Sequence, residues 1–249
     1  MSTVLDKIIS IKNPKSPISE SYRGIRTSIE FSNIDSKMKV ITITSAMQNE
    51  GKSTVISNLA VNFANLEKKV LLLEGDLRNP SVHRMFNISN AKGVTDILLD
   101  NNEFAECVHC TDIKNLHVLT SGPIPPNPSE MLSSNKMREF INDLKEDYDY
   151  IFIDTPPIGV VTDAGIISNY SDGCVFVVGS KQCDVEMAKL AKQKLDDVGA
   201  NIIGAVLNKF ESEVSGYSYY NYYYREDSER KGKRRRKNKR EKKKKNDTD

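Results

Sequence analysis

The segment SAMQNEGKST, residues 45–54, has a glycine, a lysine and hydroxyl side chains in an order that suits phosphate binding. In such a loop Gly51 lets the backbone approach the phosphate, Lys52 reaches the terminal phosphates and Ser53 binds Mg²⁺. Ala46 replaces the first glycine of the usual G-x-x-x-x-G-K-[ST] pattern. The plain alternative is a helix N-terminus with a surface lysine, but an apolar run before the segment and a helical pattern after it favour a phosphate-binding loop.

Two further segments place acidic side chains directly after apolar runs. Glu74, Asp76 and Arg78 follow the leucines of LLLEGDLRNP, and Asp154 ends the run YIFID. Carboxylates at the carboxyl ends of strands are well placed to hold a metal ion or to accept a proton, because this edge of the sheet faces the phosphate loop. Taken alone, each of these acidic segments could equally be an ordinary solvated strand end. Their order after Gly-Lys-Ser favours a nucleotide site.

Short apolar runs alternate with helical patterns over residues 39–210. Strands that are apolar on both faces predict an α/β fold of the P-loop NTPase class, with a mostly parallel sheet and helices on both faces. The predicted strands cover residues 39–44, 70–76, 116–122, 150–154, 173–179 and 202–208. The predicted helices cover residues 51–69, 93–100, 134–145, 164–168 and 185–198. The chain then divides into an N-terminal helical segment (1–38), the P-loop domain (39–210) and a flexible tail (211–249).

The overall composition of the chain further limits the classes of protein to which it can belong. At 249 residues, 38% hydrophobic and 28% charged, it suits one large α/β domain with a tail. It has no run of about 18 apolar residues and no signal-peptide pattern, which indicates the cytosol. The cysteines follow no disulfide framework, and the Cys107/Cys110 pair lacks a second ligand pair for zinc.

Charge is distributed unevenly along the chain. Residues 225–249 hold 14 Lys/Arg against 6 Asp/Glu, a net charge of +8, so residues 1–224 carry −6 of the total of +2. The basic run at residues 230–245 repels itself and has little apolar surface to bury, which predicts a disordered tail. Such a run suits anionic lipid or nucleic acid. The tyrosines precede it instead of interleaving with it, which makes single-stranded nucleic acid the weaker option.

Together, the three acidic and phosphate-binding segments resemble the Walker A, Walker A′ and Walker B motifs of bacterial tyrosine kinases (BY-kinases). The resemblance is to the soluble kinase partner of capsular and exopolysaccharide biosynthesis systems. The A′ pattern falls on residues 71–78 and Walker B on residues 151–154, and the family's Tyr-rich cluster falls on residues 217–224. The resemblance covers nearly the whole chain, and it implies an ATP- and Mg²⁺-dependent, non-specific protein-tyrosine kinase.

The resemblance also implies roles for individual residues. Lys52 would hold the β- and γ-phosphates, and the metal contacts would be Ser53, Asp76 and Asp154. Asp76 or Glu74 would act as the base. The implied nucleotide-binding residues are Asn49, Glu50, Gly51, Lys52, Ser53, Thr54 and Asn208.

A cluster of tyrosines follows the predicted domain, within SGYSYYNYYYRE at residues 215–226. A phenol with a pKa near 10 needs a carboxylate to take its proton and Mg²⁺ to neutralise the γ-phosphate. The hypothesis is that these phenols are substrates of the chain's own kinase activity, and the alternative is an aromatic patch for a partner. The six are Tyr217, Tyr219, Tyr220, Tyr222, Tyr223 and Tyr224.

The resemblance further implies partners. The family's E-x-x-R-x-x-R element, which joins subunits into a ring, is present as Glu20, Arg23 and Arg26. The residues alone would equally read as a charged helix face held by i, i+3 pairs. A membrane-embedded activator is implied as well, so we expect a cytoplasmic protein recruited to the inner face of the cell membrane, with the basic run on anionic lipid.

Two departures from the family's pattern, Glu74 and the long basic tail beyond the tyrosines, leave other readings open. Glu74 stands where the family usually has Asp, and the extra methylene displaces its carboxylate by about 1 Å, enough to slow the chemistry. A ParA/MinD-type ATPase shares the fold, but it carries a lysine early in the loop where this chain has Met47. A nucleotide-sensing scaffold without catalysis is the third reading.

Overall fold

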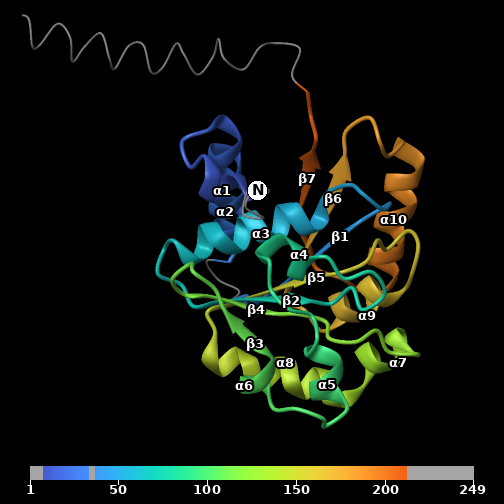
Figure 1. The fold of residues 1–249 in the computed structure, drawn as a ribbon. Coiled ribbons are helices and arrows are strands. Elements are labelled where there is room, and N and C mark those ends of the chain that lie inside the picture. Colours follow the sequence, from blue (N-terminus) through green and yellow to red (C-terminus); the bar gives the residue numbers. More distant parts are fainter. Residues whose placement is uncertain (1–7, 34–36, 212–249) are drawn as a thin grey trace, which may run out of the picture. The chain divides into compact units, whose positions relative to one another are not determined.

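The computed structural model describes residues 8–33 and 37–211 (Figure 1). The tyrosine cluster and the basic run therefore lie outside the described residues. The described chain builds one seven-stranded sheet in the order β3-β4-β2-β5-β1-β6-β7. The strands are β1 (Val40–Ser45), β2 (Val70–Glu74), β3 (Val108–Cys110), β4 (Leu116–Leu119), β5 (Tyr150–Asp154), β6 (Gly173–Gly179) and β7 (Ile202–Asn208).

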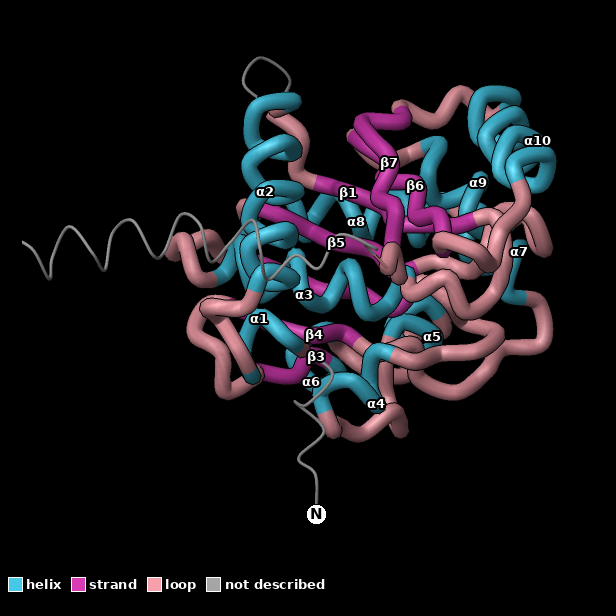
Figure 2. Tube along the Cα trace, turned by 90° about the horizontal axis from the view of Figure 1, so that it is seen from above, coloured by secondary structure: helices cyan, strands magenta, loops and turns pink. Residues whose placement is uncertain are grey.

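Helices cover both faces of this sheet, as Figures 1 and 2 show. One layer consists of α1 (Ile9–Lys12), α2 (Pro17–Ser32), α3 (Lys52–Ala64) and α4 (Val82–Phe86). The other face carries α5 (Val94–Leu98), α6 (Phe104–Cys107), α7 (Pro128–Ser133), α8 (Asn135–Asp147), α9 (Asp163–Asn169) and α10 (Val185–Asp197). Within the described ranges, no helix has both the length and the apolarity that a membrane crossing requires.

The predicted α/β class with a mostly parallel sheet is confirmed. All neighbouring strands pair in parallel except β3, which pairs antiparallel with β4 at the edge. The strand predicted for residues 116–122 ends at Leu119. Beyond it, the carbonyls of Thr120 and Ser121 accept hydrogen bonds from Val94 and Thr95 at the start of α5. The segment therefore leaves the sheet to anchor a helix.

Alternation along the central strands decides which side chains meet the phosphate loop. On β5, Phe152 packs in the cluster that contains α3, whereas Ile151 and Ile153 pack on the opposite face. On β2, Leu72 faces α3 in the same way. Side chains alternate along a strand, so Asp154 and Glu74 point to the α3 side, and the two residues are register partners.

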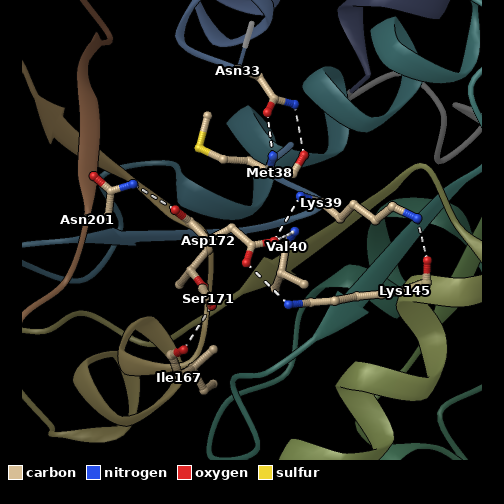
Figure 3. A network of polar contacts seen from close by, with 10 residues as sticks. Asn33, Met38, Lys39, Val40, Lys145, Ile167, Ser171, Asp172 and Asn201 are labelled. Carbon is tan, nitrogen blue, oxygen red and sulfur yellow. Dashed lines mark hydrogen bonds and ion pairs between the residues drawn. The ribbon is translucent and has the colours of Figure 1, made fainter. Parts of the chain in front are cut away.

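A separate polar network fixes the opposite end of the sheet, where β1 and β6 begin (Figure 3). The Asp172 carboxylate accepts hydrogen bonds from the backbone N–H groups of Lys39 and Val40, at 2.9 and 2.8 Å. It also pairs with Lys145 of α8 at 3.2 Å. These contacts join β1, β6 and α8 far along the strands from the predicted site, so we assign them a structural role.

The N-terminal helices belong to the same core as the sheet. Ile8, Tyr22 and Ile29 are buried in the cluster that contains α3, and Ser16 caps α2 by accepting a hydrogen bond from Ser19 N. Burial raises the pKa of Tyr22 to about 12. The predicted segment 1–38 is therefore packed on the P-loop domain over its described part.

Candidate active site

The segment between β1 and α3 has the backbone of a phosphate-binding loop. Asn49 and Gly51 adopt left-handed conformations, with φ of 64° and 95°. A Cβ on Gly51 would lie 2.2 Å from Asn208 Nδ2, so the loop and β7 meet closely here. α3 begins at Lys52 and runs for 13 residues. The loop therefore presents backbone N–H groups and a helix N-terminus to an anion.

Three side chains hold this loop from behind. Glu50 is buried, and its carboxylate accepts hydrogen bonds from Met47 N at 2.6 Å and Gly179 N at 2.7 Å. Asn208 Nδ2 donates to the Glu50 carbonyl at 2.8 Å. Lys209, which belongs to no motif of the sequence, donates from Nζ to the Asn49 carbonyl at 2.5 Å. The side chains of Glu50 and Asn208 thus brace the loop against β6 and β7.

Gly75 brings the loop after β2 against the end of β5. Its N–H donates to the Asp154 carbonyl at 2.7 Å. A Cβ at this position would lie 2.8 Å from that carbonyl oxygen and 2.9 Å from Ile153 Cγ2. Glycine is therefore required between the two acidic residues of this loop, Glu74 and Asp76.

A short series of hydrogen bonds links the loop after β2 to the phosphate-binding loop. Ser53 Oγ donates to Asp154 Oδ2 at 2.5 Å, and Ser81 Oγ donates to Ser53 Oγ at 2.7 Å. Glu74 Oε2 accepts from the N–H groups of Ser81 and Val82, at 2.6 and 2.7 Å. Ser81 carried no signal in the sequence, because a lone serine after a proline belongs to no spaced motif.

The two buried carboxylates each retain one oxygen without a partner among the described residues, Glu74 Oε1 and Asp154 Oδ1. Burial, and then the neighbouring Asp154, holds the pKa of Glu74 well above its ordinary value. Burial raises the pKa of Asp154 to about 6, against the lowering influence of Lys52. Two carboxylates in this position would be stabilised by a cation.

The residues present fit a magnesium ion. A carboxylate oxygen without a partner lies beside a serine hydroxyl, and oxygen atoms of this kind are the ligands that Mg²⁺ takes. Among residues 8–33 and 37–211, no group of three or more His, Cys, Asp or Glu side chains is arranged to hold a metal by itself. Mg²⁺ usually completes its octahedron with phosphate oxygens and water, so the site suits a metal that arrives with a nucleotide.

Asp76 and Arg78 lie on the exposed part of the same loop. Asp76 Oδ1 accepts hydrogen bonds from the N–H groups of Arg78 and Asn79, at 3.2 and 2.9 Å. The Arg78 side chain pairs with Asp163 of α9 at 2.7 Å and bonds to Ser129 of α7. Asp163 and Ser129 carry no signal of this role in the sequence, because only folding brings them to the loop from distant segments.

The structure thus brings Lys52, Ser53, Glu74 and Asp154 together, with Asp76 at the margin. The backbone of Thr54 lies in the first turn of α3, where its carbonyl accepts a hydrogen bond from Asn58. The three residues predicted for oligomerisation lie elsewhere, on α2. There Arg23 pairs with Glu20 through Nη2 at 2.5 Å, and Arg26 lies 3.5 Å from Glu30. On α2 these are contacts within one helix.

Comparison with known proteins defines the class first. A family described as an AAA domain matches residues 38–193. The septum site-determining protein MinD of Pyrococcus horikoshii, solved with Mg-ADP, superposes with a TM-score of 0.60 at 25% identity, covering 70% of this chain and 72% of MinD. The fold and the loop geometry therefore define a P-loop protein, as predicted.

Closer relatives define the family. The tyrosine-protein kinase YwqD of Bacillus subtilis is 47% identical over 214 residues, which cover 86% of this chain and 90% of YwqD. The kinase domain of the Escherichia coli tyrosine kinase ETK superposes with a TM-score of 0.81 at 30% identity, covering 86% and 89% of the two chains. The chain belongs to the family of bacterial tyrosine-protein kinases, and the predicted enzyme class is confirmed.

Proposed function

We propose that this kinase transfers the γ-phosphoryl group of ATP to its own C-terminal tyrosines, those within residues 217–224. The observation that carries the proposal is the convergence of Ser53, Glu74 and Asp154 at the start of α3, next to the Gly51-Lys52 loop. That arrangement supplies positive charge for phosphates and acidic oxygens for a cation, which phosphoryl transfer requires.

Within this proposal, the chain's residues hold and orient the nucleotide. Backbone N–H groups of residues 49–54 and the Lys52 ammonium bind the phosphates, and Lys52 is largely buried. Ser53 and Asp154 hold Mg²⁺, which would neutralise charge on the β- and γ-phosphates. Asn208, which ends β7 beside Gly51, would contact the adenine base.

The acidic residues divide into two roles. Glu74 is fully buried, and one of its oxygens is taken by two backbone N–H groups. Asp76 is only half-buried and lies on the outer part of the loop. A tyrosine hydroxyl must lose its proton during transfer, so we assign Asp76 as the proton acceptor and Glu74 as the residue that holds the loop and balances the cation.

A second candidate function is that of a ParA/MinD-type ATPase, because MinD shares the fold. The kinase proposal is supported by the higher TM-score of the ETK kinase domain, 0.81 against 0.60. It is also supported by Met47, which occupies the position of the ATPase lysine and is 37% exposed.

The cellular setting of the proposal rests on family resemblance. We infer a role in regulating capsular or exopolysaccharide synthesis and export, with a membrane-embedded activator as partner. The basic run at residues 230–245 would add attraction to anionic lipid, about 1 kcal/mol for each Lys or Arg near the surface. The membrane-embedded activator and the attraction to anionic lipid would together recruit the protein to the inner face of the membrane.

The experiment that tests the proposal follows the fate of the γ-phosphate. The full chain, with a candidate activator peptide, is incubated with Mg²⁺ and γ-labelled ATP, beside a variant with the six cluster tyrosines changed to Phe. We expect labelled protein from the wild type and little label on the variant. ATP turnover that releases only inorganic phosphate from both chains would contradict the proposal and favour the ATPase.

A further inference from the structure

The Arg78 guanidinium is held by residues from two distant parts of the chain. Its Nε donates to Asp163 Oδ2 at 2.7 Å, and its Nη2 donates to Asp163 Oδ1 at 3.1 Å. Nη2 also donates to Ser129 Oγ at 2.8 Å, and Ser129 Oγ donates to Asp163 Oδ1 at 2.7 Å. The three side chains therefore form a closed ring of hydrogen bonds that joins the loop after β2 to α7 and α9.

Asp163 is the fixed member of this ring. Its side chain is 0% exposed, whereas the Arg78 side chain is 40% exposed. A buried carboxylate requires a paired cation, and a bidentate guanidinium supplies both the charge and the geometry. The direction of the Arg78 side chain is thus set by Asp163 and by the ends of α7 and α9.

α9 contacts the same loop at a second point. Ile167 Cδ1 would lie 3.0 Å from a Cβ on Gly75. The loop is therefore fixed at Gly75, against β5 and α9, and again at Arg78, through Asp163. Asp76 lies between these two anchor points.

Arg78 and Asp76 are also close to each other. Asp76 Oδ1 accepts the Arg78 N–H, so the two residues share one turn, and their charges interact. A guanidinium released from Asp163 would find the half-buried Asp76 carboxylate on its own turn. Arginine binds carboxylates bidentately, and that pairing would occupy Asp76.

We propose that Asp163 and Ser129 are positioning residues for phosphoryl transfer, because they hold the Arg78 side chain away from Asp76 and leave that carboxylate free for the acceptor tyrosine. The inference rests on the proposed function, in which Asp76 accepts the tyrosine proton. It concerns the acceptor side, since the side-chain hydrogen bonds of the ring run among Arg78, Asp163 and Ser129.

The test is steady-state kinetics of tyrosine phosphorylation with three variants of the full chain. Asp163→Asn keeps the side-chain volume and removes the charge, and we expect kcat to fall at least tenfold while the KM for ATP stays within twofold. The double variant Asp163→Asn/Arg78→Gln removes the released cation as well. We expect its kcat to be at least threefold higher than that of Asp163→Asn. Ser129→Ala should lower kcat by a smaller factor.

The kcat of the double variant distinguishes a positioning role of Asp163 from a purely structural one. If Asp163 served only to stabilise the fold, removing Arg78 would not restore kcat, so a double variant no faster than Asp163→Asn overturns the inference. An unchanged kcat in Asp163→Asn also overturns it. If Asp163→Asn shows no cooperative thermal melting, Ser129→Ala decides: a lower kcat at unchanged KM for ATP supports the inference, and an unchanged kcat overturns it.

Wild type and Lys52→Met are measured alongside these variants. A wild type that transfers no phosphate to tyrosine contradicts both the proposed function and the inference. An active wild type with a fully active Asp163→Asn contradicts the positioning role alone.

Discussion

Two neighbouring carboxylates, Glu74 and Asp154, show how the site is built at the scale of single residues. They end adjacent strands in register, point to the same side of the sheet and are both buried. Burial and mutual proximity raise the pKa of Glu74, and burial raises that of Asp154. The ligand-free protein therefore keeps two acids where their charged forms are disfavoured, and a bound cation would relieve this.

This arrangement makes the stability of the ligand-free protein depend on pH. The folded-state pKa of Asp154, about 6, lies above its ordinary value of 3.8, so the folded state binds this proton more tightly than the unfolded state. The contribution is present below about pH 4 and is lost as pH rises through about 6, at a cost of about 3 kcal/mol. Glu74, whose pKa is also raised, acts in the same direction.

Replacing Asp154 by Asn should therefore stabilise the ligand-free protein at pH 8. We expect the free energy of unfolding in urea with EDTA to rise by about 2 kcal/mol at pH 8 and by less at pH 5, while phosphoryl transfer is lost. Asp172→Asn is the matched control: it removes charge from a carboxylate that is already paired, so stability should fall at both pH values. A less stable Asp154→Asn at pH 8 would contradict the assignment.

At the scale of elements, the loop between β2 and α4 is the part that assembles the site. It carries Glu74, Asp76, Arg78 and Ser81, and its path depends on the close approach of Gly75 to β5. Because the nearest atom to that Cβ position is the backbone carbonyl oxygen of Asp154, at 2.8 Å, side-chain rotation alone cannot make room for a Cβ.

Gly75→Ala should shift this loop. We expect a loss of about 1–3 kcal/mol in unfolding free energy together with a strong fall in phosphoryl transfer. Gly24→Ala is the control, because Gly24 lies in α2 with nothing within 4 Å of its Cβ position. We expect this variant to raise the free energy of unfolding by about 0.5–1 kcal/mol. Chemical denaturation and a kinase assay on both variants provide the check, and equal stability for the two would refute the close approach.

Elements were predictable wherever the apolar pattern was strong. The strands at residues 150–154, 173–179 and 202–208 have the predicted bounds, because each is an apolar, β-branched run in a parallel sheet. β5 and β6 are buried, whereas β7 is a partly exposed edge strand. β3 was missed, since Val108–Cys110 is three residues long and only partly buried. The loop motifs were visible from local spacing, whereas Ser129 and Asp163 reach Arg78 only through tertiary packing.

At the scale of the whole molecule, the arginines of α2 are the residues predicted to take part in assembly. On α2, Arg23 pairs with Glu20 and donates to the Pro14 carbonyl at 2.9 Å. Arg26 Nε is buried without a hydrogen-bond partner among the described residues. The local pairs, including the ion pair of Arg26 Nε with Glu30 at 3.5 Å, fit the plain reading of a charged helix face. A buried Nε that makes no hydrogen bond among the described residues fits a contact with a second subunit.

The double variant Arg23→Ala/Arg26→Ala tests the ring. We expect light scattering after size exclusion to show a smaller mass than the wild-type assembly, because the proposed intersubunit cations are gone. Lys189→Ala is the control, since Lys189 also makes an i, i+3 pair, with Glu186 on α10, and should leave the mass unchanged. Equal masses for wild type and the double variant would contradict a role for these arginines in assembly.

The most direct test of the central claim is the intact mass and phosphopeptide map of the full chain after incubation with ATP, Mg²⁺ and a candidate membrane activator. The account predicts phosphate on tyrosines within residues 217–224 in the wild type and none in Lys52→Met. Unmodified tyrosines in the wild type, with ATP still consumed, would contradict it.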